Sequence, residues 1–278
     1  MRGIHQPSPR AVAERWPLAT WTSLTERALY QARRLRQMAT NSHGKFLLVR
    51  SSAELGNYLE LRQRDSSLTA GLLSIEGAHA LDGKLENVDA LYAAGYRMMS
   101  PSHFFDNDIG GSAAGVNKTG LTEKGRALIR RMEAKHMIVD LAHASPQTVD
   151  DVLTIATRPL VVSHTGVKAT CDNNRNLSDA QIHGVARTGG LIGIGYWSTA
   201  TCGQDAKAIV RAMRHVSDLV GAEHLALGSD FDGAVEEPFD TTGLVEITEQ
   251  LLLAGFSQDQ IRMIMGGNAL RFLKDNLP

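Results

Sequence analysis

The chain has 278 residues, of which 43% are hydrophobic, and its formal net charge is −1. This length suits one barrel domain of about 250 residues, and the balanced charge argues against nucleic acid or an anionic membrane surface as a partner. No apolar run approaches the roughly 18 residues of a membrane span, and residues 1–10 lack the apolar core of a signal peptide. We therefore expect a cytoplasmic protein without a membrane segment, in which Cys171 and Cys202 are reduced thiols.

The first 20 residues contain three prolines and no clear periodicity, so we interpret them as a poorly anchored lead. A helix is predicted from about Thr22 to Met38, with Ser23 or Thr25 as its N-cap, followed by a short strand over 45–50 and a helix over 52–64. The chain then alternates between short apolar runs and helical stretches. The runs predicted as strands are Gly71–Glu76, Tyr96–Ser100, Met137–Leu141, Leu160–Ser163, Leu191–Tyr196 and Leu225–Gly228.

This alternation of strands and helices is typical of a parallel sheet covered by helices. The helices between the strands are predicted over 87–94, 122–135, 145–157, 178–188, 205–220 and 242–254, with two more over 257–265 and 268–276. No interior linker or short repeat divides the chain. Residues 1–278 are therefore expected to form a single domain.

Two histidines close neighbouring apolar runs. His143 follows the run that begins at Met137, His164 follows the run that begins at Leu160, and one predicted helix separates them. In such a βαβ unit both histidines emerge at the same end of a parallel sheet, and parallel neighbours lie about 5 Å apart. Both imidazoles could therefore reach one metal ion.

The other predicted strands also end in polar side chains. Glu76 ends the first of the six runs, His103 follows the second, and Asp230 follows the last. Each alone has an ordinary structural explanation: a satisfied histidine, a carboxylate bonded to a backbone amide, or a turn-forming aspartate. Placing charged groups at the ends of buried apolar strands costs free energy unless they are paired or bound to a metal. The set of residues taken together therefore predicts a metal-dependent site.

Imidazole and carboxylate ligands suit zinc, manganese, iron or cobalt. The chemistry expected at such a site is hydrolysis, because a metal activates water and polarises a carbonyl, and Asp230 could transfer the proton. A Rossmann-type oxidoreductase is disfavoured, because no Gly-x-Gly-x-x-Gly follows an early strand. A serine hydrolase is disfavoured as well, because the chain has no Gly-x-Ser-x-Gly elbow. A non-catalytic barrel that retains a ligand pocket is the alternative outside the enzymes.

Five strings resemble the membrane (renal) dipeptidase family, zinc metallopeptidases of the amidohydrolase superfamily. The strings are Ser74-Ile-Glu-Gly-Ala-His79, Asp140-Leu-Ala-His-Ala-Ser145, Val162-Ser-His-Thr165, Asn174-Arg-Asn176 and Gly228-Ser-Asp-Phe-Asp-Gly233. The resemblance extends from about Trp16 to Leu277. It implies a TIM-barrel-like (β/α)8 fold, a binuclear zinc site and hydrolysis of dipeptides.

The resemblance also implies roles for individual residues. Glu76 matches the carboxylate that bridges two metals, and His143 and His164 match the ligands of the second metal. Asp230 matches an acid near the first metal that handles protons and contacts substrate. The remaining matches are to substrate-binding residues: His103 stabilises the tetrahedral intermediate, and Arg175 pairs with the C-terminal carboxylate of the substrate, for which a guanidinium fork is well suited.

One feature of the family is missing. Family members begin with a strand carrying His-x-Asp, which supplies two ligands to the first metal, but no His-x-Asp precedes Glu76. A second early strand is also missing, and residues 45–50 are interpreted as a segment outside the barrel. The fold is therefore predicted to be an incomplete barrel that lacks its first one or two strands. We expect one zinc ion rather than two, held by Glu76, His143 and His164, with Asp230 as a further candidate metal ligand.

An open barrel exposes strand edges, so we expect either a homo-oligomer or residues 1–40 to cover the gap. The function predicted is metal-dependent hydrolysis of a small dipeptide substrate, impaired by the missing ligands. The alternatives are another amidohydrolase reaction, such as lactone or deaminase chemistry, or a weakly active or inactive remnant that acts as a binding or oligomeric protein.

Overall fold

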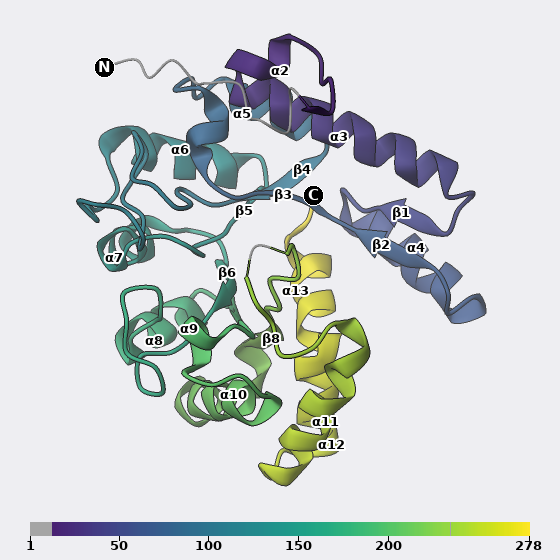
Figure 1. Cartoon of the computed structure of the whole chain (residues 1–278), viewed down its shortest axis with the longest axis vertical. Coiled ribbons are helices and arrows are strands. Elements are labelled where there is room, and N and C mark those ends of the chain that lie inside the picture. Colours follow the sequence, from purple (N-terminus) through teal and green to yellow (C-terminus); the bar gives the residue numbers. More distant parts are fainter. Residues whose placement is uncertain (1–12, 234) are drawn as a thin grey trace.

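Six parallel strands form the centre of the fold (Figure 1). The computed structural model describes residues 13–233 and 235–278. The central strands are β3 (Leu73–Ile75), β4 (Tyr96–Met99), β5 (Ile138–Val139), β6 (Val161–Thr165), β7 (Leu191–Ile194) and β8 (Leu225–Leu227). Each overlaps one of the six apolar runs of the sequence, so the predicted strands are confirmed.

The six strands form one open series. β3, β4 and β5 pair in that order, as do β6, β7 and β8. A parallel bridge between Asp140 and Val161 joins the two groups, and the Leu141 amide donates to the Val161 carbonyl over 2.7 Å. Among the described residues no pairing returns from β8 to β3, so the series does not close. This agrees with the predicted incomplete TIM-barrel-like fold.

Helices follow the strands and surround them (Figure 1). Their starts and buried faces follow from the sequence: the Ser145 side chain accepts from the Thr148 amide where α7 begins, and Ile209, Met213 and Val216 of α10 are fully buried because they share one helix face. Within the described residues no helix is both long and apolar enough to cross a bilayer. The helices are α5 (Asn87–Ala93), α6 (Glu123–Ala134), α7 (Pro146–Ile155), α8 (Asp179–Arg187), α9 (Ser198–Thr201), α10 (Ala206–Val220), α11 (Leu244–Leu253), α12 (Gln258–Arg262) and α13 (Asn268–Asn276).

The described N-terminal region adds three helices and a second small sheet. α3 begins where Ser23 accepts from the Glu26 amide, which confirms one of the two predicted caps. β1 and β2 pair in parallel, and only Leu72 separates β2 from β3, so β1 lies beside the segment that continues into the first central strand. The interpretation of residues 45–50 as lying outside the barrel stays a prediction. These elements are α2 (Ala19–Thr22), α3 (Leu24–Asn41), β1 (Phe46–Leu48), α4 (Ser52–Arg64) and β2 (Thr69–Gly71).

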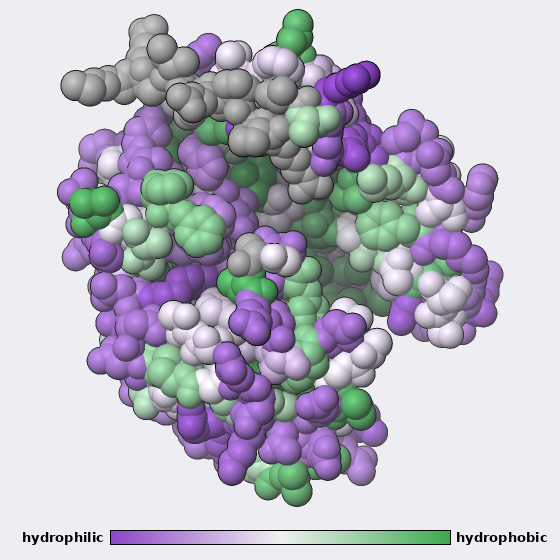
Figure 2. All heavy atoms as spheres, in the orientation of Figure 1, coloured by the Kyte–Doolittle hydropathy of each residue, from purple (hydrophilic) through white to green (hydrophobic). Residues whose placement is uncertain are grey.

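The C-terminal helix packs between α4 and the last two strands of the open series. α13 contacts β7 and β8 on one side and α4 on the other, and the Ser52 amide donates to the Pro278 carbonyl over 2.9 Å. Phe272 of α13 and the following Leu277 belong to a buried cluster that also contains strand residues such as Ile138. Apolar side chains gather in Figure 2 over β1 and β2 and in the hollow between them and α13. Within the described chain, α13 therefore covers part of the gap that we had assigned to an oligomer or to residues 1–40.

Part of the expected N-terminal lead is well anchored, contrary to the prediction for residues 1–20. Trp16 is buried with its ring centroid 5.0 Å from that of Tyr30, and Thr20 is fully buried. Burial of a large aromatic ring fixes the chain from residue 13 onward against α3. Residues 1–12 of the expected lead lie outside the described residues.

The two cysteines form a disulfide, so the expectation of reduced thiols is wrong. Cys171 and Cys202 are bonded, with their Cα atoms 5.2 Å apart and a separation of 31 positions in sequence. They lie in the loops that follow β6 and β7, which are neighbouring strands. The bond links the loop that carries Arg175 to the segment around α9.

Candidate metal centre

The five predicted site residues at strand ends all lie at the carboxyl end of the open series. Glu76 directly follows β3, His103 follows β4 and His143 follows β5. His164 lies near the end of β6, and Asp230 follows β8. The parallel strands therefore deliver all five residues to one edge, which is where barrel enzymes place their active sites.

Two of these residues have an unusual backbone conformation. His143 has a φ of 64° and Asp230 a φ of 67°, both in the left-handed region. That region costs a residue other than glycine about 1 kcal/mol or more and is found preferentially at functional sites. At both positions the chain turns sharply just after a buried strand.

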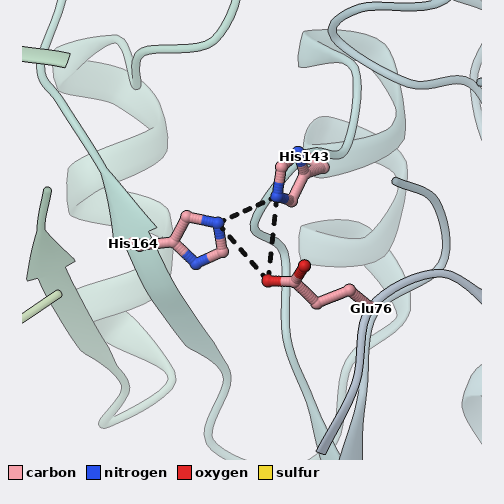
Figure 3. Close-up of side chains that lie close together, drawn as sticks. All are labelled: Glu76, His143 and His164. Atoms are coloured by element: carbon pink, nitrogen blue, oxygen red, sulfur yellow. Dashed lines mark hydrogen bonds and ion pairs between the residues drawn. The ribbon is translucent and has the colours of Figure 1, made fainter. Parts of the chain in front are cut away.

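Glu76, His143 and His164 point at one another (Figure 3). The Nε2 atoms of the two histidines lie 2.8 Å apart. Glu76 Oε1 lies 3.8 Å from His143 Nε2 and 3.5 Å from His164 Nε2. These three potential ligand atoms all fall within 4.8 Å of one another. The predicted convergence of the three side chains is therefore present in the structure.

The surroundings favour neutral imidazoles. Burial, followed by the positive charge of Arg175, lowers the pKa of His143 to about 2. Burial and then Arg175 also lower the pKa of His164. A metal binds the neutral ring through a nitrogen lone pair, so both histidines are held in the form that can serve as a ligand.

Glu76 is held in its charged form. Burial alone would raise the pKa of this carboxyl, but its hydrogen bond to His103 and the positive charge of Arg175 lower the pKa overall. His103 Nε2 lies 3.2 Å from Glu76 Oε2. Glu76 thus offers one oxygen to the histidine pair and the other to His103.

Asp230 behaves differently from Glu76. Burial raises the pKa of Asp230, and the nearby carboxylates of Asp232 and Glu76 raise it further, against the opposing effects of His164 and Arg175. A carboxyl group whose pKa is raised toward neutrality is suited to accept and return a proton. Asp230 does not belong to the cluster of ligand atoms within 4.8 Å, so its role as a metal ligand stays a prediction.

A cavity of about 330 Å³ opens over these residues. This is the small end of the range for ligand pockets, about 300–1,000 Å³, and it suits a ligand of dipeptide size. A larger cavity of about 950 Å³ lies between α10 and α11, away from the strand ends. The smaller cavity is lined by Glu76, His103, Phe104, Ala113, Ala114, His143, Arg175, Trp197, Thr199, Asp230, Asp232 and Val235.

Arg175 reaches the cavity from the loop after β6. Its Nη2 donates to the His164 carbonyl over 2.8 Å, and its guanidinium carbon lies 5.6 Å from the centre of the Trp197 ring. Burial lowers the pKa of Arg175 to about 10, so the group stays positively charged near neutral pH. A buried guanidinium beside a small cavity is well placed to pair with a carboxylate.

The loop that carries Arg175 is tied to the segment around α9. Besides the disulfide, Asn173 Nδ2 donates to the Thr199 carbonyl over 2.8 Å, and Asn176 Nδ2 donates to the carbonyls of Cys171 and Ala200. The sequence analysis did not predict that Asn173, Asn176 and Cys171 hold the Arg175 loop against the segment around α9. The one available signal was that these residues lie close to Arg175 in the chain, because the carbonyl groups of Thr199 and Ala200 that they contact are more than 20 positions away in sequence.

A family model described as membrane dipeptidase (peptidase family M19) matches residues 11–276. The chain belongs to this family. The match confirms the resemblance seen in the sequence strings, and it places the protein among the metal-dependent dipeptidases, which are hydrolases.

Two relatives show how much of the chain is shared. An uncharacterized protein from the pqqA 5′ region of Klebsiella pneumoniae is 32% identical over 256 residues, which cover 87% of this chain and 93% of that protein. The dipeptidase aclJ of Aspergillus oryzae is 32% identical over 216 residues, which cover 74% of this chain and 51% of that protein. The chain thus spans nearly all of the first relative and about half of the second.

Solved structures show the same fold. The dipeptidase AC, a metallo peptidase of family M19, superposes with a TM-score of 0.79 at 25% identity, covering 88% of this chain and 74% of that one. A metallo peptidase from Rhodobacter sphaeroides, liganded with a phosphinate mimic of the dipeptide L-Ala-D-Ala, superposes with a TM-score of 0.76 at 25% identity, covering 89% and 73%.

The donor set of this chain fits a divalent metal. Two neutral imidazole nitrogens and one charged carboxylate oxygen converge from three strand ends, and their mutual distances allow one ion to contact all three. Nitrogen and oxygen ligands of this kind hold zinc at about 2.0–2.2 Å. The metallopeptidase family implies a metal, and these three residues form the candidate site for it in this chain.

Proposed function

We propose that this protein hydrolyses dipeptides with one zinc ion held by Glu76, His143 and His164. The observation that carries the proposal is the convergence of these three ligand atoms within 4.8 Å at the floor of a cavity that also contains a buried arginine. We propose one ion and not two because residues 1–75 of the sequence contain no His-x-Asp, the motif that the resemblance assigns to the first metal.

The charged residues that line the cavity offer a partner for each end of a dipeptide. Arg175 would pair with the C-terminal carboxylate of the substrate, and the carboxylates of Asp230 and Asp232 lie on the same cavity as potential partners of the N-terminal ammonium. His103, within 3.2 Å of Glu76, would donate to the oxygen of the scissile carbonyl as negative charge develops there. The substrate would thus be oriented by both its termini.

The chain's own residues would also move the proton. When bound, the ion would polarise the peptide carbonyl and make a water molecule more acidic. Asp230 would take a proton from that water on a carboxylate oxygen and pass it to the nitrogen of the leaving amine. The raised pKa of Asp230 supports this role, because a carboxyl closer to neutrality both accepts and releases a proton readily.

Turnover by metal-reconstituted protein tests the proposal. Chelator-treated protein would be assayed with graded zinc against Ala-Ala, its C-terminal amide and a lactone panel that tests another amidohydrolase reaction. We expect zinc-dependent hydrolysis of the free dipeptide.

Replacing Glu76 with Gln should reduce turnover by about 100-fold or more, since even outer partners of metal ligands contribute about 10- to 100-fold. Glu60→Gln, an exposed change on α4, is the matched control. Absence of dipeptide turnover in zinc-loaded wild-type protein would refute the proposal and favour a binding or oligomeric remnant.

Two further predictions concern the whole molecule. We propose a homo-oligomer, which is supported by exposed apolar side chains on α11, including Val245 at 69% and Leu253 at 73% exposure. Sedimentation analysis tests it, and a purely monomeric species would contradict it. The cytoplasmic location stays a prediction, and the reduced thiols that were expected with it are absent, because Cys171 and Cys202 form a disulfide.

A further inference from the structure

A buried carboxylate joins the two strands that carry the histidine ligands. Asp140 directly follows β5 and is 2% exposed. Its Oδ1 accepts from the amides of Ala142 and Ser163 at 3.0 Å and 2.9 Å, and its Oδ2 accepts from the Ser163 hydroxyl at 2.6 Å. β5 and β6 are otherwise joined only by the bridge at Asp140 and one further backbone bond in the described chain. Asp140 therefore holds both strand ends together just below the proposed metal ligands.

The hydrogen bonds of Ser163 determine the protonation of the neighbouring histidine. The hydroxyl has one proton, and it donates that proton to Asp140 Oδ2. Ser163 Oγ also lies 2.8 Å from His164 Nδ1. Because the hydroxyl proton is already used, this second bond requires His164 to donate from Nδ1. A neutral ring with its proton on Nδ1 has its lone pair on Nε2.

We propose that Asp140 and Ser163 are positioning residues that hold His164 as the Nδ1–H tautomer, ready to bind the metal through Nε2. His164 Nε2 is the atom that faces His143 and Glu76, at 2.8 Å and 3.5 Å. Neither Asp140 nor Ser163 lines the cavity, so they act through His164 and not on the substrate. The inference rests on the proposed metal site, since it assigns the support of one of its ligands.

An isosteric change at Asp140 provides a sharp test. In Asp140→Asn, the amide oxygen could still accept from the backbone amides while the new NH2 group donates to Ser163 Oγ. The hydroxyl proton would then turn toward His164 Nδ1 and force the proton of the ring onto Nε2, where it blocks metal binding. Ser163→Ala removes the hydrogen bond to His164 Nδ1, so neither ring nitrogen of His164 is favoured as the site of the proton. Ser163→Thr keeps the hydroxyl and therefore the hydrogen bond. The matched control is Ser67→Ala, which removes a Ser–Asp hydrogen bond of the same 2.6 Å length at the surface.

The measurements are the zinc dissociation constant, by competition with a chromophoric chelator, and the ¹⁵N chemical shifts of His164 in chelator-treated protein. We expect Ser163→Ala to weaken zinc binding about 10-fold and Asp140→Asn about 100-fold, with Ser163→Thr and Ser67→Ala close to wild type. In the wild type the shifts should show a protonated Nδ1, and in Asp140→Asn a protonated Nε2.

Two results would overturn the inference: wild-type zinc affinity in folded Asp140→Asn and Ser163→Ala, or a wild-type His164 that carries its proton on Nε2. Thermal unfolding of each variant separates a loss of fold from a loss of zinc binding. If wild-type protein binds no zinc, the proposed function fails, whereas the tautomer measurement still decides the hydrogen-bond assignment by itself.

Discussion

The Nε2 atoms of His143 and His164 lie 2.8 Å apart, although the two histidines are 21 positions apart in the chain. The path between them is one βαβ unit, β5–α7–β6, which returns the chain to the same edge of the sheet. Both rings are buried and kept neutral by their surroundings. This pair, together with Glu76, forms the proposed metal site, and its burial has measurable consequences.

Burial of the histidines should make chelator-treated protein sensitive to acid. The folded chain lowers the pKa of His143 from 6.5 to about 2, so below about pH 6.5 the unfolded chain binds a proton that the folded chain does not. Stability should therefore fall as the pH falls from 6.5, by about 1 kcal/mol per pH unit from this residue. His143→Gln should show a shallower decline in urea unfolding between pH 7 and pH 5. The exposed His183→Gln on α8 is the control, and equal slopes in His143→Gln and wild type would refute the argument.

Arg175→Met should impair the binding of substrates that have a free C-terminal carboxylate. A charge-assisted hydrogen bond contributes about 1.5–3 kcal/mol, which corresponds to roughly 10- to 100-fold in kcat/KM. The loss should appear with the free dipeptide and vanish with its C-terminal amide, which has no carboxylate to pair. Steady-state kinetics on both substrates checks this. An equal loss on both would show that Arg175 acts on the fold or the metal site and not on the substrate.

Removing the disulfide should destabilise the protein. The bond between Cys171 and Cys202 closes a loop of about 30 residues, for which a loss of about 3 kcal/mol is expected when both cysteines become alanine. Urea unfolding under oxidising conditions measures the effect. Wild-type protein treated with a reductant should approach the double variant. If the reductant leaves wild-type stability unchanged, the bond does not contribute as the structure implies.

Phe272 of α13 should be critical for stability, because α13 packs between α4 and the strands β7 and β8. Phe272 is 4% exposed in a cluster with strand residues, so Phe272→Ala should cost about 3–5 kcal/mol. Leu270, on the same helix but 39% exposed, provides the control: Leu270→Ala should cost less than about 1 kcal/mol. Similar losses for the two variants would contradict the packing of α13 described above.

The positions of the metal ligands could be predicted from the sequence for a simple physical reason. Each of Glu76, His143 and His164 sits at or beside the end of an apolar run, and parallel strands of a βα series must end at the same edge. Neither the side-chain geometry nor the pKa values were needed for that prediction. The disulfide could not be predicted in this way, because Cys171 and Cys202 lie in loops whose proximity depends on the lengths and turns of the segments between them.

The hydrogen bonds that position the metal ligands and the packing of the C-terminal helix could not be predicted from the sequence either. Asp140 directly follows β5 and Ser163 lies within β6, and nothing in their spacing shows that one carboxylate accepts hydrogen bonds from both segments. The apolar face of α13 has the same periodicity whichever surface it covers. Its packing against α4 and β8 depends on the gap in the strand series, which is a property of the whole fold.

The most direct test of the central claim is a crystal structure of zinc-loaded protein with anomalous data collected at the zinc absorption edge. The account predicts one strong anomalous peak, about 2.0–2.2 Å from Glu76 Oε1, His143 Nε2 and His164 Nε2. A peak elsewhere in the molecule, or no peak at these three atoms in zinc-saturated crystals, would contradict it.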